Sequence, residues 1–140
     1  MENIINTIIK EAEKAYKKGE IPVGCAIVKE DKIVSKAYNL KENKKMATYH
    51  AEILAINKAC KKLKTWHLDD CTLYTTMEPC IMCSGAIIQS RIKKIVYILD
   101  NKSFGNIKNN DYFNNDKYEI VKIEDQRALD LIQNFFKNKR

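Results

Sequence analysis

The sequence predicts an α/β protein, a three-layer α/β/α sandwich built on a mixed central sheet of about five strands. From the middle of the chain onward, short strand-like runs alternate with segments of helical periodicity, which indicates parallel strands covered by helices on both faces. Earlier in the chain, two strand-like runs lie close together and predict a hairpin. With 45% hydrophobic residues, the 140-residue chain can bury a core, and we expect residues 1–140 to form a single domain.

The first half of the chain predicts two helices separated by the hairpin. The expected elements are a helix over 1–18, strands over 23–28 and 33–38, a polar loop over 39–49 and a helix over 50–63. Gly19 marks the end of the first helix, because glycine is the common residue after a helix C-terminus.

The second half repeats strand and helix. The expected elements are a strand over 71–76, a helix over 80–90, a strand over 94–99, a long Asn-rich loop over 100–117, a weaker strand over 118–123 and a helix over 126–136. Pro79 precedes the helix at 80–90, a position that helix starts tolerate.

Composition limits the class of protein. Lys and Arg outnumber Asp and Glu by 25 to 18, which suits a polyanionic partner such as RNA, although a Lys- and Asn-rich surface can also reflect biased nucleotide usage. No run approaches the ~18–20 apolar residues of a membrane span. Residues 1–18 scatter charges among their apolar positions, unlike a secretory signal. We expect a cytoplasmic protein with no membrane association.

Two of the five cysteines have the spacing of a metal site. The odd cysteine count argues against a disulfide framework, and three cysteines lie among apolar neighbours where burial is expected: Cys25, Cys60 and Cys71. Cys80 and Cys83 lie three apart at a helix start, so both sulfurs can face one point as thiolates. His50 begins the preceding helix and can add an imidazole. Three ligands leave one tetrahedral position for water, as in a catalytic zinc site.

Glu52 supplies the acid–base chemistry that such a site needs. Glu52 lies two residues from His50, and zinc lowers the pKa of its bound water toward ~7. Glu52 can therefore take a proton from this water and hand it to a ring nitrogen, then to the leaving amine. His-x-Glu combined with Pro-Cys-x-x-Cys is the known signature of zinc deaminases. The alternatives are a closed structural zinc site with Cys60 or Cys71 as fourth ligand, and a thiol-redox role, which leaves His50 and Glu52 unexplained.

These motifs and the stretches around them resemble the tRNA adenosine deaminases, which convert a wobble adenosine in the anticodon loop to inosine. Similarity extends over most of the chain, in residues 19–24, 38–39, 48–53, 72–74, 77–83, 85–86, 90–92 and 135–140. The resemblance implies a cytidine deaminase-like fold, a homodimer, and a tRNA anticodon stem-loop as partner.

The resemblance also assigns roles to residues. It implies one Zn²⁺ per subunit, with ligands His50, Cys80 and Cys83, and Glu52 as the proton shuttle. The flipped purine would bind to the Asn39 side chain, the Ala51 backbone amide and Pro79. Candidate RNA contacts are Lys45, Arg91, Lys102, Lys137, Lys139 and Arg140.

Two segments that lie near the RNA in the family depart from its pattern. Residues 45–48 read Lys-Met-Ala-Thr, where bacterial relatives usually carry Asp-Pro ahead of the Thr. Residues 100–107 contain one glycine in place of a Gly-rich segment, and Ile98 stands where glycine is preferred. Two other functions therefore stay open: deamination of a free base or nucleoside such as guanine or cytosine, and a non-catalytic zinc subunit that binds RNA. The presence of Glu52 argues against the second.

Overall fold

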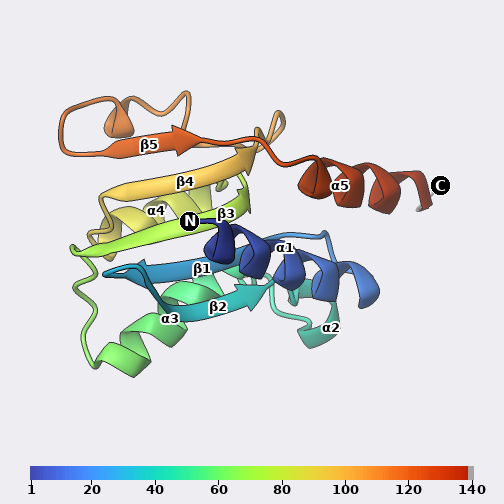
Figure 1. Cartoon of the computed structure of the whole chain (residues 1–140), viewed down its shortest axis with the longest axis horizontal. Helices are drawn as coiled ribbons and strands as arrows, with labels where there is room; N and C mark the ends of the chain where they lie inside the picture. Colours follow the sequence, from blue (N-terminus) through green and yellow to red (C-terminus); the bar gives the residue numbers. More distant parts are fainter. Residues whose placement is uncertain (139–140) are drawn as a thin grey trace.

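The computed structural model describes residues 1–138 and contains one five-stranded mixed sheet with helices on both faces (Figure 1). The strands are β1 Gly24–Lys29, β2 Lys32–Tyr38, β3 Cys71–Met77, β4 Lys94–Leu99 and β5 Glu119–Lys122. They lie in the order β2-β1-β3-β4-β5. β1 is antiparallel to both β2 and β3, whereas β3, β4 and β5 are parallel, with Leu73 opposite Ile95. The predicted three-layer fold with about five strands is confirmed.

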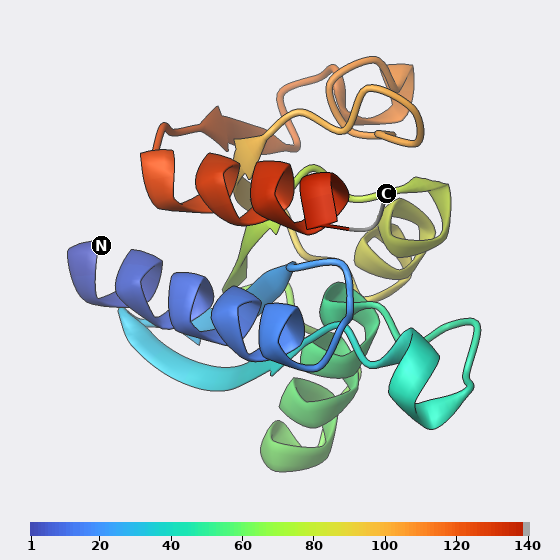
Figure 2. The same cartoon turned by 90° about the vertical axis from the view of Figure 1, so that its right-hand side faces the viewer.

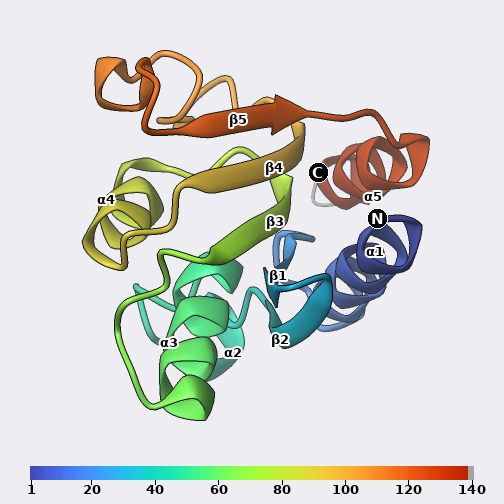
Figure 3. The same cartoon turned by 60° about the vertical axis from the view of Figure 1, so that its left-hand side comes forward.

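The helices of nine or more residues form the two outer layers. The helices are α1 Glu2–Lys17, α2 Lys41–Lys44, α3 Ala51–Leu63, α4 Ile81–Gln89 and α5 Gln126–Asn138, with a 3₁₀ turn, η1, at Asp111–Phe113. α3 and α4 cover one face of the sheet and α1 and α5 cover the other (Figure 3). Figure 2 shows α1 and α5 side by side. Within residues 1–138, no helix is long and apolar enough to span a bilayer.

Side chains alternate between two apolar clusters, one on each face of the sheet. Along β1, Cys25 and Ile27 pack in the cluster under α3 and α4, whereas Ala26 and Val28 pack in the cluster under α1 and α5. The amphipathic faces that the sequence predicts for these helices are the faces that are buried.

The structure adds two short elements to the predicted order. α2 and η1 lie inside segments that were expected to be loops. The expected burial of three cysteines holds for Cys25 and Cys71, but Cys60 is only half-buried, because it lies in the last turns of α3 at the border of the core.

The parallel strands determine at which edge of the sheet functional residues can meet. β3 and β4 both end at the same edge of the sheet, where open α/β sheets bind ligands. The chain leaves β3 into Pro79 and Cys80, and it leaves β4 into the loop that begins at Asp100. The N-terminus of α3 reaches the same region, since Cys80 lies within hydrogen-bonding distance of His50.

Candidate active site

His50, Cys80 and Cys83 converge with the spacing of zinc ligands. His50 Nδ1 lies 3.7 Å from Cys80 Sγ and 3.7 Å from Cys83 Sγ, and all three ligand atoms lie within 4.8 Å of one another. A tetrahedral zinc with bonds of about 2.0–2.1 Å to nitrogen and about 2.3 Å to sulfur separates these atoms by about 3.6 Å. One imidazole and two thiolates therefore fit zinc in their present positions.

Two helix N-termini build this cluster. His50 is the N-cap of α3 and Cys80 is the N-cap of α4, both with extended backbone, and neither side chain caps its helix. The partial positive charge of a helix N-terminus favours thiolate. A hydrogen bond from the Cys83 thiol and, to a smaller extent, one from His50 lower the pKa of Cys80 to about 3. The hydrogen bond between the two cysteines also raises the pKa of Cys83. The pair thus already favours one thiolate.

Glu52 lies in the first turn of α3 and is 4% exposed. Burial raises its pKa to about 7, although the adjacent His50 favours the charged form. A carboxyl group with a pKa near neutrality can both take and return a proton at neutral pH. Glu52 is the second residue of the helix that His50 caps, and it belongs to the buried face of α3 together with Ala55 and Ile56.

The three predicted substrate-binding residues lie around the same cluster. The Ala51 N–H donates to Asn39 Oδ1 at 2.8 Å, and Asn39 Nδ2 donates to the carbonyl of Ile21 at 3.0 Å. Asn39 is therefore fixed next to the start of α3. Pro79 is buried directly before Cys80, and its carbonyl accepts from the N–H of Asn106 at 2.9 Å.

The candidate RNA contacts are more scattered. Lys45 and Lys102 are exposed on the two loops that border the cluster. Arg91 follows the other end of α4, a nine-residue helix about 14 Å long, where it bonds His67 Nδ1 at 2.9 Å and lies over the Trp66 ring. Lys137 is exposed on α5, on the opposite face of the sheet. Lys139 and Arg140 lie outside the described residues.

Neither proposed fourth ligand reaches the cluster. Cys71 begins β3 and Cys60 lies near the C-terminal end of α3, so each is at the far end of its element from the metal ligands. Within residues 1–138, the group of side chains that can hold a metal consists of His50, Cys80 and Cys83. The site is thus an open three-ligand site.

Two buried carboxylates with no predicted role anchor the bordering loops. Glu20 accepts hydrogen bonds from the backbone N–H groups of Glu42 and Asn43, at 3.1 and 2.7 Å, in the loop before His50. Glu78 accepts from backbone N–H groups in the loop after β4. Their partners lie more than twenty positions away in the sequence, so the only local signal is an acidic residue beside an apolar run.

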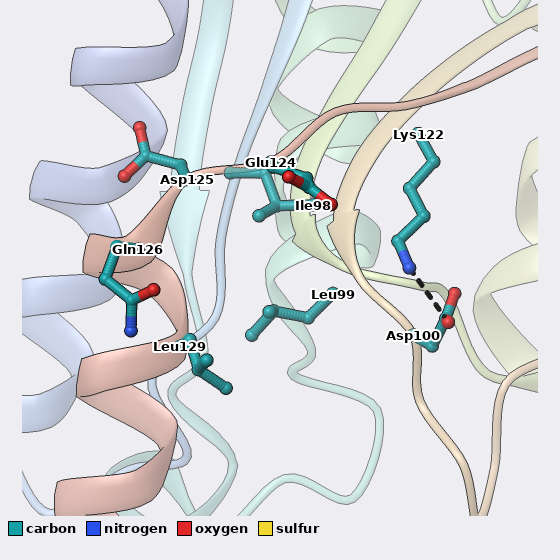
Figure 4. Close-up of a pocket in the computed structure, with 8 residues that line it drawn as sticks. All are labelled: Ile98, Leu99, Asp100, Lys122, Glu124, Asp125, Gln126 and Leu129. Atoms are coloured by element: carbon teal, nitrogen blue, oxygen red, sulfur yellow. Dashed lines mark hydrogen bonds and ion pairs between the residues drawn. The ribbon is translucent and has the colours of Figure 1, made fainter.

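Ile98, which stands where the resemblance leads us to expect glycine, lies away from the metal ligands. Ile98 is buried in the cluster under α1 and α5, whereas the metal ligands lie on the α3 and α4 side. It lines a cavity of about 270 Å³ between the end of β4 and the start of α5, where Lys122 bonds Asp100 at 2.9 Å (Figure 4). Two acidic residues, Glu124 and Asp125, also line this cavity, so it does not suit a polyanion.

Comparisons with known proteins agree with this site. Residues 1–99 match the cytidine and deoxycytidylate deaminase zinc-binding region. A tRNA-specific adenosine deaminase of Aquifex aeolicus is 44% identical, over 99% of this chain and 95% of its own.

Two solved structures share the fold. A structure from a study of A-to-I editing by tRNA:A34 deaminases at the wobble position of transfer RNA is 26% identical, with a TM-score of 0.80 over 86% of this chain and 97% of its own. A Bacillus subtilis guanine deaminase is 36% identical, with a TM-score of 0.69 over 74% of this chain and 70% of its own. The zinc ligands are His50, Cys80 and Cys83. The chain belongs to the zinc-binding cytidine and deoxycytidylate deaminase family, among its tRNA-specific adenosine deaminases.

Proposed function

We propose that this protein converts adenosine to inosine at the wobble position of a tRNA anticodon loop by zinc-dependent hydrolysis. The observation that carries the proposal is the open His50, Cys80 and Cys83 cluster beside the buried Glu52. Similarity to a tRNA-specific adenosine deaminase along 99% of the chain supports the choice of substrate. The formal net charge of +7 suits RNA, and a loop base can be extruded at lower cost than a base in a duplex.

Glu52 moves the protons in this reaction. Zinc, when bound, activates a water for attack at the ring carbon that carries the amine. Glu52 accepts the proton that the water loses and delivers it to the adjacent ring nitrogen. It then carries the second water proton to the departing amine, so that one water enters and one ammonia leaves. Its burial keeps bulk water from taking over these transfers.

Asn39 and Ala51 are proposed to hold the purine. An amide side chain offers two N–H hydrogens and two oxygen lone pairs. Asn39 uses one hydrogen for the Ile21 carbonyl and one lone pair for the Ala51 N–H. One donor and one acceptor are then left for a base edge. Pro79, which fixes the turn before Cys80, would form part of the wall of the base pocket.

Lys45 and Lys102 are the proposed phosphate contacts next to the base, because they lie on the two loops that border the metal cluster. Arg91, Lys137, Lys139 and Arg140 are proposed to contact more distant phosphates. The structure describes Arg91 and Lys137 of this group, and in a single subunit both lie away from the metal cluster.

A homodimer is proposed as the working form, with residues 1–140 of each chain as one deaminase domain. Ile81 on α4 is 74% exposed, and Trp66 is also exposed. A mainly apolar hollow of about 380 Å³ lies between α3 and α4. Exposed apolar surface of this kind marks interaction sites, and a second copy of the chain is the proposed occupant. Light scattering should give twice the chain mass, and Ile81→Lys should give monomers.

Deamination of a free base is the second candidate function. It is favoured by the 36% identity to a guanine deaminase structure. The bordering loops decide between the two functions, because an RNA substrate must contact them and a free base need not.

One substrate panel tests the proposal. Zinc-loaded protein is incubated with an anticodon stem-loop that carries wobble adenosine, with the same RNA carrying adenosine only in its stem, and with free adenosine, guanine and cytosine. Mass spectrometry of the products should show inosine only in the first RNA. Conversion of guanine or cytosine without conversion of the RNA would replace the proposed function with the second candidate.

A further inference from the structure

Glu78 is a buried carboxylate that binds backbone rather than metal. It is 4% exposed at the point where the chain leaves β3 for Pro79 and Cys80. Its Oε1 accepts the N–H of Asn101 at 3.2 Å, and its Oε2 accepts the N–H groups of Ile107 and Lys108 at 3.0 and 2.9 Å. Hydrogen bonds to an ionised group are the strong class, so these contacts offset the burial of the charge and fix the loop that donates them.

We call residues 101–108 the clamp loop. The clamp loop also contacts the metal-binding turn directly. The N–H of Asn106 donates to the Pro79 carbonyl at 2.9 Å, and Gly105 pairs with Cys80 in a β-bridge. Ser84 Oγ, one turn into α4, donates to Asn106 Oδ1 at 3.0 Å. The clamp loop and the turn that carries two zinc ligands thus form one hydrogen-bonded unit.

Gly105 shows how closely the two parts approach. A Cβ atom at this position would overlap Glu78 Oε1 and the carbonyl oxygen of Asn101. Only a residue without a side chain lets the loop lie against the carboxylate. The single glycine of this segment therefore stands at the contact with Glu78.

The clamp loop presents side chains outward next to the metal cluster. Phe104 is 73% exposed, and Lys102 is exposed two positions earlier. An aromatic ring beside a cation is suited to stack on a base and neutralise a phosphate of single-stranded RNA.

We propose that Glu78 is a positioning residue whose carboxylate holds the clamp loop against the metal-binding turn as the RNA-facing wall of the site. This inference rests on the proposed RNA substrate. It predicts that loss of the carboxylate affects RNA binding more than the chemical step, because Glu52 and Cys83 lie within α3 and α4 and His50 caps α3, outside the clamp loop.

Two variants test the contact from its two sides. Glu78→Gln keeps one oxygen but turns an NH₂ group toward backbone donors, so at least one of the hydrogen bonds is lost. Gly105→Ala keeps the carboxylate but fills the space against it. Glu11→Gln is the matched control, since Glu11 is also a buried carboxylate but lies on α1, on the other face of the sheet, paired with Lys14.

Three readouts are needed: hydrogen exchange of the Asn101, Ile107 and Lys108 amides by NMR, zinc content, and kcat and KM with the wobble stem-loop. For both variants we expect at least one of these amides to exchange about tenfold faster, and KM to rise about tenfold. We expect kcat to stay within about threefold of native and zinc to remain at one per chain. Glu11→Gln should leave all three readouts at native values.

Unchanged exchange in Glu78→Gln would overturn the clamp. A lower kcat with unchanged KM and full zinc would also overturn the proposal, because Glu78 would then act on the chemistry. If the native protein made no inosine, the proposed function would fail instead. The exchange and zinc measurements would still decide whether Glu78 holds the loop.

Discussion

Replacing Glu52 by glutamine isolates the proton-transfer step. Glutamine has nearly the same volume and leaves His50, Cys80 and Cys83 in place. Glu52 is 4% exposed, so bulk water has little access to its position. The titratable groups that act on Glu52 most directly are these three metal ligands, and they are bonded to zinc when zinc is bound. We therefore expect no neighbouring base to replace it.

The size of the effect follows from this isolation. A positioned general acid or base contributes about 10²–10⁴-fold to the rate. With no substitute in reach, we expect kcat of Glu52→Gln to fall by about 10³–10⁴-fold, equivalent to about 4–5.5 kcal/mol in the barrier.

The assay is single-turnover formation of inosine with protein in excess over stem-loop RNA, with zinc measured in the same samples. Glu42→Gln is the control, because this exposed carboxylate lies on α2 in the loop before His50 and should leave the rate unchanged. If the Glu52→Gln protein kept its zinc and reacted within about tenfold of the native rate, Glu52 would not be the proton shuttle.

Further variants test the metal, the RNA contacts and the fold. Removal of zinc with a chelator should abolish activity and re-addition should restore it, whereas Cys83→Ser should bind zinc too weakly to recover; metal analysis checks both. Lys45→Ala and Lys102→Ala should raise KM with little change in kcat, and each should reduce the slope of log affinity against log salt by about 0.7, the value per phosphate for single strands; filter binding at several salt concentrations measures this. Gly24→Ala should destabilise the fold by about 3 kcal/mol, because a Cβ there would overlap the Ile8 carbonyl of α1; chemical denaturation measures the loss.

Periodicity predicted the elements that have a buried face. α1, α3 and the strands carry apolar residues at regular spacing, and each lies within a few residues of its expected range. α2 has no buried residue, so its four positions carry no apolar period that sequence analysis could detect. It is held from outside by Glu20, a contact that spans more than twenty positions.

The metal site was predictable for a different reason. Its ligands come from short motifs at the starts of two helices, so the local spacing already places Cys80 and Cys83 together. The approach of His50 depends on the sheet, which brings the starts of α3 and α4 to one edge. The role of Glu78 depends on packing between remote segments, and no local pattern reports it. The distance of Arg91 from the cluster follows instead from the length of α4, close to the helix that the sequence predicts over 80–90.

A zinc held by His50, Cys80 and Cys83 has a fourth position open for water and substrate. X-ray absorption at the zinc edge tests this arrangement on the native protein. We expect one zinc per chain with two sulfur neighbours at about 2.3 Å and two nitrogen or oxygen neighbours at about 2.0–2.1 Å. A third sulfur neighbour, or absence of a stoichiometric metal, would contradict it.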